Sequence, residues 1–370
     1  MPLADPARTE ALGRLDELPR ARLGHAPTPI DAMPNLGARL GGARLYVKRD
    51  DCTGLAFGGN KVRQLEFYLG EAVARNADTV LITGAVQSNF VRLAAAGARK
   101  LAMDCHIQLE ERVPKTDPLY RNSGNVLLDR ILGATLHSYA HGEDEAGADR
   151  RIREIAAELE AKGRRPYVIP LAPGHAPLGA LGYVVAAREI VAQMEADSLA
   201  IDEVVVASGS GNTHAGLLFG FRALGCPVTV TGICVRRPAE PQRERIVSRC
   251  REIAELLGVK PMVGDGDIRL LDDVLAPGYG QLNAPTIEAI ETAARTEALI
   301  LDPIYTGKAM AGFIRRARQA GPGRSLLFVH TGGTPALFAY GTALAEALSG
   351  ETAGGEMAGG EMAGGETAGG

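Results

Sequence analysis

The feature that most constrains the fold is an alternation of short β-rich runs with amphipathic helical stretches between about residues 43 and 345. We predict strands at residues 43–48, 79–82, 204–207, 228–234 and 326–329. We predict helices at residues 60–76, 88–100, 144–162, 213–224 and 241–257. Such alternation indicates mainly parallel sheets covered by helices. A chain of 370 residues, 46% of them hydrophobic, is long enough for two α/β lobes.

The C-terminal end differs from the rest of the chain. Residues 351–370 repeat the sequence E-[T/M]-A-G-G four times. Such a Gly-rich segment cannot bury enough apolar surface to offset the entropy lost on ordering. We therefore expect residues 346–370 to form a disordered tail, for which a role as an adaptor segment stays open.

Composition disfavours several classes of protein. The chain has 40 basic and 44 acidic residues, and the four Glu of the repeats account for the difference, so no basic surface for nucleic acid is implied. The longest apolar runs are strand-sized and charges interrupt the N-terminus, which predicts no membrane span, no signal peptide and a cytoplasmic location. Five cysteines without a CxxC pair predict buried free thiols, with no disulfide framework and no metal site.

One strand-to-helix junction has the composition of a phosphate site. Residues 202–217, DEVVVASGSGNTHAGL, contain an apolar run that leads into a turn and then into a helix. The turn consists of Ser208, Gly209, Ser210, Gly211, Asn212 and Thr213. Small residues let backbone N–H groups surround an anion, and the dipole of the following helix favours its charge. The glycine spacing matches neither a dinucleotide fingerprint nor a P-loop, and a simple tight turn is the alternative.

Lys61 is the candidate nucleophile. It follows Asn60 in the sequence FGGNKVR, residues 57–63, at the first turn of a predicted helix. A helix N-terminus and partial burial both disfavour an ammonium ion, which leaves the amine ready to form an imine. Lysine is also scarce, with seven against 33 arginines. Taken alone, however, the motif fits a surface lysine in a capped helix better than a nucleophile.

Three further stretches place polar groups close to strand ends. In TGAVQSNFVR, residues 83–92, Ser88 and Asn89 could cap a helix or bind a carboxylate. Tyr279 in PGYG and Tyr305 in DPIYTGK lie beside glycines that allow close approach of a ligand, and a phenol beside a cation can act as an acid or base. In LLFVHTGGTP, residues 326–335, the Thr331 hydroxyl could meet a bound heterocycle. Each stretch also has an ordinary structural interpretation as a cap, a packed aromatic or a strand end.

Together these five stretches resemble the pyridoxal 5′-phosphate (PLP) family of D-cysteine desulfhydrase, L-cysteate sulfo-lyase and 1-aminocyclopropane-1-carboxylate (ACC) deaminase. The motifs G-G-N-K, Q-S-N, S-G-S-G-x-T, P-x-Y-x-G-K and H-x-G-G occur in this order, and the resemblance covers about residues 20–345. It implies the tryptophan synthase β-like fold, with PLP in a cleft between two lobes. We expect a larger PLP-binding lobe of residues 1–55 and 171–345 and a smaller inserted lobe of residues 56–170.

The resemblance implies how the cofactor is held. Lys61 carries it as an imine and moves the Cα proton of the substrate. Thr331 places a neutral hydroxyl against the pyridine nitrogen, which moderates the electron sink and suits elimination more than transamination. The remaining implied contacts come from Asn60, from Asn89 at the pyridoxal 3′-oxygen, and from the backbone of residues 208–213 with the Thr213 hydroxyl at the phosphate.

The resemblance also assigns the substrate side. Ser88 and Asn89 face the substrate, and Ser88 contacts its carboxylate or takes part in proton transfer. Tyr279 and Tyr305 line this side, and Tyr305 is the better candidate for assisting proton transfer or departure of the leaving group. Phe90 stands where the family commonly has His, so an apolar wall replaces a polar group beside the substrate.

The expected reaction is α,β-elimination on D-cysteine, which gives pyruvate, sulfide and ammonia. L-cysteate, ACC and another small amino acid are the alternative substrates. ACC deaminases typically carry Glu and Leu where this chain has Thr306 and Thr331, which disfavours ring opening. Gln64 and Asn212 replace a lysine and a glycine common in the family, and we interpret both as variations. A PLP-holding scaffold is the non-enzyme alternative, and the resemblance implies a homodimer.

Overall fold

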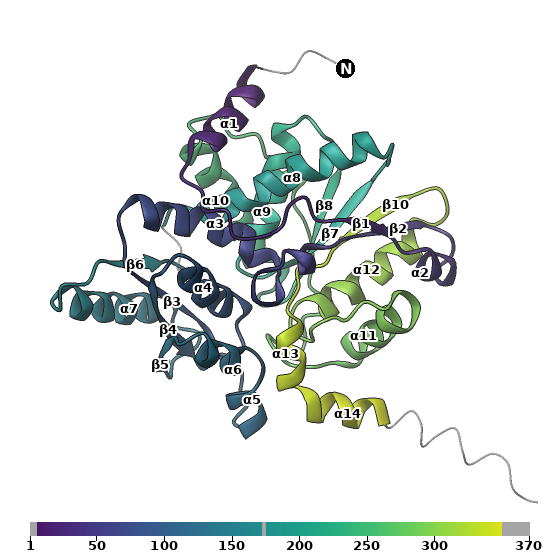
Figure 1. The fold of residues 1–370 in the computed structure, drawn as a ribbon. Helices are drawn as coiled ribbons and strands as arrows, with labels where there is room; N and C mark the ends of the chain where they lie inside the picture. Colours follow the sequence, from purple (N-terminus) through teal and green to yellow (C-terminus); the bar gives the residue numbers. More distant parts are fainter. Residues whose placement is uncertain (1–5, 172–174, 350–370) are drawn as a thin grey trace, which may run out of the picture.

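The computed structural model describes residues 6–171 and 175–349, which build two sheets that lie side by side (Figure 1). The larger sheet has six strands in the order β1-β2-β10-β7-β8-β9. Every neighbouring pair is parallel except β1 with β2. Its strands are β1 (Ile30–Ala32), β2 (Arg44–Lys48), β7 (Glu203–Ser208), β8 (Thr229–Cys234), β9 (Arg269–Leu271) and β10 (Ser325–Val329).

The smaller sheet has four parallel strands in the order β5-β4-β3-β6. They are β3 (Thr79–Ala85), β4 (Asp104–Glu110), β5 (Thr135–Tyr139) and β6 (Pro166–Ile169). Every residue of β3 is buried, because helices cover both faces of this sheet. This double coverage explains why the central strands are continuous apolar runs in the sequence.

Helices cover both faces of each sheet (Figure 1). On the larger sheet, α8, α9 and α10 pack on one face, whereas α2, α11 and α12 pack on the other. On the smaller sheet, α3 and α4 cover one face and α7 the other. The helices are α1 (Pro6–Glu17), α2 (Pro34–Arg39), α3 (Asn60–Ala74), α4 (Asn89–Lys100), α5 (Pro118–Asn122), α6 (Gly124–Ile131), α7 (Glu145–Glu160), α8 (Leu178–Ala196), α9 (Asn212–Ala223), α10 (Ala239–Leu256), α11 (Ala284–Glu297), α12 (Thr306–Ala320), α13 (Thr334–Ala339) and α14 (Gly341–Ser349), with 3-10 turns at Asp50–Cys52, Leu55–Phe57 and Asp265–Asp267.

Helix α3 connects the two sheets, because it packs on α4 of the smaller sheet and on α8 of the larger one. Arg63 fixes α3 to the larger sheet through buried ion pairs with Asp50 and Glu189, both at 2.9 Å. The lobe boundaries given above stay a prediction, and α3 is the segment on which they depend. Since Lys61 begins this helix, its position is tied to both sheets.

The fold class predicted from the sequence is confirmed, and each predicted strand and helix is present with its ends shifted by a few residues. The cysteines need a correction: all five are free, but Cys52 is exposed and Cys226 only partly buried. The predicted disordered tail begins too early: residues 346–349 are the helical end of α14, and residues 350–370 lie outside the described residues. Within the described ranges, no helix is long and apolar enough to cross a membrane, and no cluster of three metal-ligating side chains occurs.

Candidate active site

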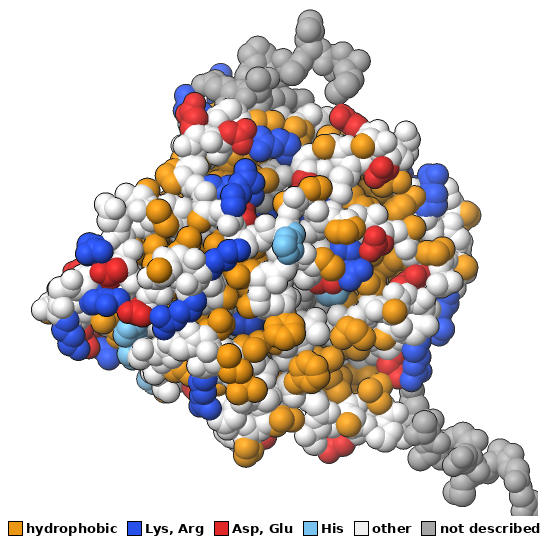
Figure 2. Space-filling view, viewed as in Figure 1, with side chains coloured by type: hydrophobic (Ala, Val, Ile, Leu, Met, Phe, Trp, Pro, Cys, Tyr) orange, Lys and Arg blue, Asp and Glu red, His pale blue; other side chains and the backbone are white. Residues whose placement is uncertain are grey.

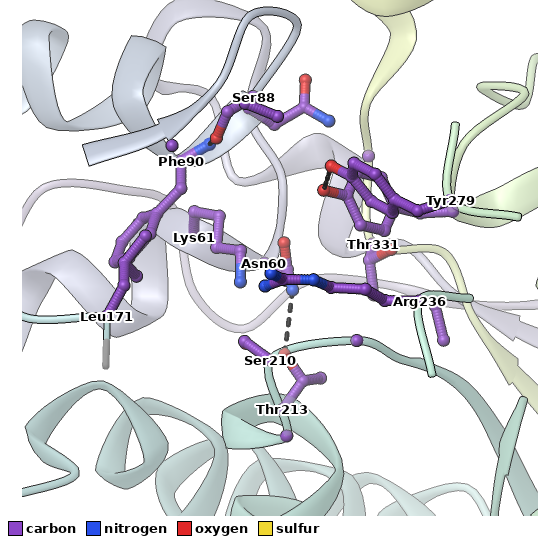
Figure 3. Close-up of a pocket in the computed structure, with 18 of the residues that line it drawn as sticks. Asn60, Lys61, Ser88, Phe90, Leu171, Ser210, Thr213, Arg236, Tyr279 and Thr331 are labelled. Atoms are coloured by element: carbon purple, nitrogen blue, oxygen red, sulfur yellow. Dashed lines mark hydrogen bonds between the residues drawn. The ribbon is translucent and has the colours of Figure 1, made fainter. Parts of the chain in front are cut away.

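The ends of several parallel strands meet at one pocket (Figure 3). Strand carboxyl ends are where open α/β sheets bind ligands. Most of the residues selected from the sequence line this pocket together. They are Asn60, Lys61, Ser88, Asn89, Phe90, Gly209, Ser210, Gly211, Thr213, Tyr279, Tyr305 and Thr331.

Lys61 extends from the first turn of α3 into the middle of the pocket (Figure 3). Its Nζ lies 3.4 Å from Gln64 Oε1 and 5.0 Å from the centroid of the Phe90 ring. Burial lowers the pKa of this amine to about 8. A usable fraction is therefore unprotonated near neutral pH, as a nucleophilic amine requires.

Two glycine turns hold Lys61 against the end of β10. A Cβ on Gly332 would lie 2.7 Å from the Gly59 Cα, so no larger residue fits at Gly332. Both glycines have positive φ, +122° at Gly59 and +81° at Gly332. The Asn60 N–H donates to the Thr331 carbonyl oxygen over 3.0 Å. Only glycine fits this contact, and it brings Lys61 and Thr331 to the same pocket.

The turn after β7 has the donors that a phosphate needs. Helix α9 begins at Asn212, directly after Gly211 with φ +96°. The first N–H groups of a helix have no partner within it and attract anions. Thr213 Oγ1 accepts hydrogen bonds from Asn60 Nδ2 and Gln64 Nε2, both at 2.9 Å (Figure 3). With both lone pairs used, the hydroxyl proton of Thr213 is available to donate into the pocket.

Two residues of this turn direct their side chains elsewhere. Ser208 Oγ lies 3.2 Å from His214 Nδ1 and accepts from Gln242 Nε2 at 2.9 Å. Asn212 is buried beside Tyr68. Neither residue is among those that line the pocket. Their predicted part in phosphate binding therefore rests on their backbone amides alone and stays a prediction.

Asn89 and Ser88 stand at the start of α4. The Asn89 Oδ1 accepts from Arg92 Nη1 and Asn125 Nδ2, both at 3.1 Å, so the amide nitrogen is left as the donor that can serve a ligand. Ser88 is the N-cap of α4, and its Oγ accepts from Phe90 N at 3.2 Å. Ser88 also lines the pocket, so its hydroxyl proton and the start of α4 are suited to bind an anion there.

Tyr279 and Tyr305 form a phenol pair on the opposite side of the pocket. Their hydroxyl oxygens lie 2.5 Å apart and their rings meet edge to face, with centroids 5.9 Å apart. Burial raises the pKa of Tyr279 and raises that of Tyr305 well above the usual value. Both phenols are therefore protonated at neutral pH and are suited to donate rather than to accept a proton.

Lys308, the lysine of the DPIYTGK motif, is not the cation that lies beside these phenols. Lys308 Nζ donates to the carbonyl oxygens of Leu275 at 2.9 Å and Gly278 at 2.7 Å, which tethers the loop that carries Tyr279. The basic side chains near these phenols are instead Arg112 and Arg236, which line the pocket and were not predicted from the sequence. The sequence feature that could have identified them is their position just beyond the carboxyl ends of β4 and β8.

The fold and the pocket define a PLP-dependent enzyme. Residues 21–332 match the family model described as pyridoxal-phosphate dependent enzyme, and the chain belongs to this family. It is 43% identical over 334 residues to the D-cysteine desulfhydrase of Salmonella choleraesuis (strain SC-B67) and 42% identical to that of Salmonella typhi; each alignment covers 89% of this chain and 98% of the relative. The family resemblance and the PLP cofactor inferred from the motifs are thereby confirmed.

Solved structures agree with this assignment. A crystal structure of an ACC deaminase homologue is 40% identical, has a TM-score of 0.81 and covers 91% of this chain and 98% of its own. An O-ureido-L-serine synthase structure, 18% identical with a TM-score of 0.60, shares the fold alone; it covers 89% of this chain and 94% of its own.

The residues present fit PLP. A buried amine of lowered pKa and a helix N-terminus built from small residues line the same pocket. A Cβ on Gly209 would lie 3.3 Å from Val235 Cγ2, so the phosphate turn packs closely against Val235. Lys61 would hold the aldehyde of the cofactor, the turn with Thr213 its phosphate, and Asn89 its ring oxygen.

Proposed function

We propose that this chain catalyses α,β-elimination on D-cysteine, with water consumed and pyruvate, sulfide and ammonia released. The observation that carries the proposal is that Lys61, the phosphate turn and the phenol pair line one pocket. The D-cysteine desulfhydrases cited above are similar over nearly their whole length, which supports the choice of substrate. When bound, PLP supplies an electron sink that acidifies the Cα–H bond of an amino acid.

The side chains of this enzyme have separate tasks in the proposed reaction. Lys61 removes the Cα proton, because its amine is both close to the centre of the pocket and readily deprotonated. Ser88 and the N–H groups at the start of α4 bind the substrate carboxylate. Tyr305, hydrogen-bonded to Tyr279, donates a proton to the departing sulfur. Phe90 forms the wall of the pocket next to Lys61 and keeps water away from the amine.

Product assays on the purified holoenzyme test this proposal. D-cysteine, L-cysteate and ACC are supplied separately, and pyruvate, sulfide, sulfite and 2-oxobutyrate are measured. We expect D-cysteine to give pyruvate and sulfide in equal amounts. Formation of 2-oxobutyrate from ACC in place of pyruvate would replace the proposal with ring opening. An enzyme that binds PLP but forms none of these products would support the scaffold alternative.

Two positions argue against ACC as the substrate. Thr306 is fully buried, and its hydroxyl donates to Asp302 Oδ2 at 2.7 Å, so it does not reach the pocket. Thr331 does line the pocket and offers a hydroxyl where ACC deaminases typically have a leucine. Elimination is therefore favoured over ring opening, and the remaining choice lies between thiol and other β substituents.

We also propose that the enzyme is a homodimer that works in the cytoplasm. Figure 2 shows apolar side chains gathered on the face where Figure 1 places α13. Leu127 of α6, Ile131 of α6 and Phe338 of α13 are 47%, 69% and 64% exposed, and these helices pack together. An apolar patch of this kind suits a second copy of the chain. Five free thiols support a reducing compartment. Sedimentation of the wild type and of Phe338→Glu tests the dimer.

A further inference from the structure

Arg92 is a buried arginine behind the pocket to which the proposed reaction assigns no task. It is fully buried on α4, three residues after Asn89. Its Nη1 donates to Asn89 Oδ1 at 3.1 Å and to Asn125 Oδ1 at 2.8 Å, and its Nη2 donates to the Gly58 carbonyl oxygen at 3.0 Å. The guanidinium is therefore fixed at both ends, and one end contacts a residue that lines the pocket.

The contacts of Arg92 decide which end of the Asn89 amide is free to meet a ligand. Arg92 Nη1 and Asn125 Nδ2 both donate to Asn89 Oδ1 at 3.1 Å. A flipped amide would turn its own N–H groups toward these donors, and both hydrogen bonds would be lost. Asn125 is itself oriented, because its Nδ2 donates to the Gln87 carbonyl oxygen at 3.0 Å and its backbone N–H to Gln87 Oε1 at 2.9 Å. The Asn89 nitrogen thus stays free to donate into the pocket.

The charge of Arg92 is not paired with a carboxylate. Burial lowers the pKa of Arg92 to about 10, so the guanidinium is still charged near neutral pH, and its three acceptors are neutral. Two acidic groups raise this pKa from nearby, Asp129 and Asp302. Burial raises the pKa of Asp129 to about 8, and within the described residues neither of its carboxyl oxygens has a hydrogen-bond partner. Asp302 accepts instead from the backbone N–H groups of residues 304–306.

A cation hydrogen-bonded to an amide oxygen polarises the amide and makes its N–H groups stronger donors, most of all in a buried site. We propose that Arg92 is a positioning residue that acts through Asn89: it keeps the Asn89 nitrogen toward the cofactor and strengthens its hydrogen bond to the ring oxygen of PLP. This inference rests on the PLP chemistry of the proposed function and on the expected contact of Asn89. It does not depend on which amino acid is the substrate.

Absorbance of the holoenzyme without substrate tests this inference. When PLP is held as an imine, one proton is shared between the imine nitrogen and the ring oxygen, and the two arrangements absorb at different wavelengths. A strong donor at the ring oxygen favours the arrangement in which this oxygen is anionic. We expect Arg92→Gln to raise the ratio of the neutral-oxygen band to the anionic-oxygen band by about tenfold. Arg249→Gln is the control, because Arg249 is also buried but does not line or contact the pocket.

Asn125→Asp is a second variant that changes the side-chain volume little, and it decides the question if Arg92→Gln does not fold. It removes the donor to Asn89 Oδ1 and places a carboxylate against Arg92 Nη1, so the same band ratio should rise. Asn89→Ala should raise the ratio as well. Adding Arg92→Gln to Asn89→Ala should then change the ratio less than about threefold, because Arg92 acts through Asn89.

The band ratios also show what would overturn the role of Arg92. A wild-type ratio in Asn125→Asp overturns it, and so does an Arg92→Gln ratio equal to that of Arg249→Gln. Effects of Asn89→Ala and Arg92→Gln that multiply in the double variant overturn it too, because Arg92 would then act independently of Asn89. If the ratios follow the expectation but D-cysteine is not consumed, the proposed elimination fails and the role of Arg92 stands.

Discussion

The two sides of the pocket are built in different ways. The cofactor side, defined here as residues 58–61, 208–213 and 331–333, consists of three short contiguous segments rich in glycine, and much of what it offers is backbone. The substrate side, defined here as Phe90, Arg112, Arg236, Tyr279 and Tyr305, consists of single side chains from distant segments. The first therefore depends on chain conformation, and the second on which side chains stand at a few positions.

This difference separates residues that the backbone conformation requires from residues that can be substituted. A backbone cradle tolerates few substitutions, because a Cβ at Gly332 would collide with the neighbouring turn. The substrate side uses side chains and not backbone conformation, so we expect its residues to be exchangeable with less effect on PLP binding. Changes on the cofactor side should thus impair PLP binding and every substrate equally, whereas changes on the substrate side should alter substrate choice and rate while PLP stays bound.

Lys61→Ala should have the largest effect, because it removes both the covalent attachment of PLP and the base. We expect kcat to fall by a factor on the order of 10⁴ or more, for all substrates alike. The absorption band of the bound cofactor, and its loss on treatment with borohydride, provide the measurement. Lys162→Ala, which changes an exposed lysine, is the control. A Lys61→Ala protein with the same borohydride-sensitive band would disprove the assignment.

Gly332→Ala should weaken PLP binding by about 30-fold or more, since it combines a strained positive φ with a collision of 2.7 Å with the Gly59 Cα. Gly323→Ala is a matched control: its φ is also positive, at +87°, but no heavy atom lies within 4 Å of the added Cβ. Both variants should lose some thermal stability, and only Gly332→Ala should lose cofactor affinity. Equal affinities would show that the glycine contact does not shape the cofactor side.

Much of the fold and of the cofactor side could be predicted from the sequence, because their signals are local. The strand through Val204 is a continuous apolar run, and the glycines after it stand next to each other in the chain. Lys61 follows its glycine pair directly, so one segment contains both the nucleophile and the turn that positions it. A short window of sequence is enough to recognise such features.

The substrate side could not be predicted as well, because it depends on contacts between distant segments. Lys308 is three residues from Tyr305, yet its ammonium binds carbonyls about 30 residues earlier in the chain. Ser208 stands in the phosphate turn, but His214 and Gln242 take its side chain. Arg236 belongs to no motif, and its importance arises only from the pocket into which the sheet directs it.

Tyr305→Phe tests the substrate side. Removal of this hydroxyl breaks the 2.5 Å hydrogen bond to Tyr279 and removes the proposed proton donor, so kcat for D-cysteine should fall by about 100-fold. Tyr279→Phe should have a smaller effect, because it removes only the partner. PLP affinity, measured by titration of the apoenzyme, should stay unchanged in both variants. Tyr167→Phe is a control at a buried phenol that does not line the pocket.

The pKa of Lys61 predicts how PLP uptake depends on pH. Because burial lowers this pKa to about 8, the amine is neutral above pH 8 and increasingly protonated below it. The rate of PLP uptake by the apoenzyme should therefore fall by about tenfold for each pH unit below 8 and level off above it. Stopped-flow absorbance between pH 6 and pH 9 measures this. A rate that still rises steeply above pH 9 would mean that the amine keeps the pKa of an exposed lysine.

Phe90→His should have the smallest effect, and it separates the two sides most directly. The Phe90 ring centroid lies 5.0 Å from Lys61 Nζ, so an imidazole there would place a polar nitrogen beside the base and the substrate. One added hydrogen bond predicts a rise in kcat/KM for D-cysteine of about three- to tenfold, without a change in PLP affinity. Phe90→Leu controls for the loss of the aromatic ring. If the histidine variant turns over D-cysteine at the rate of the wild type, substrate choice is set by the arginines and phenols opposite and not by the wall next to Lys61.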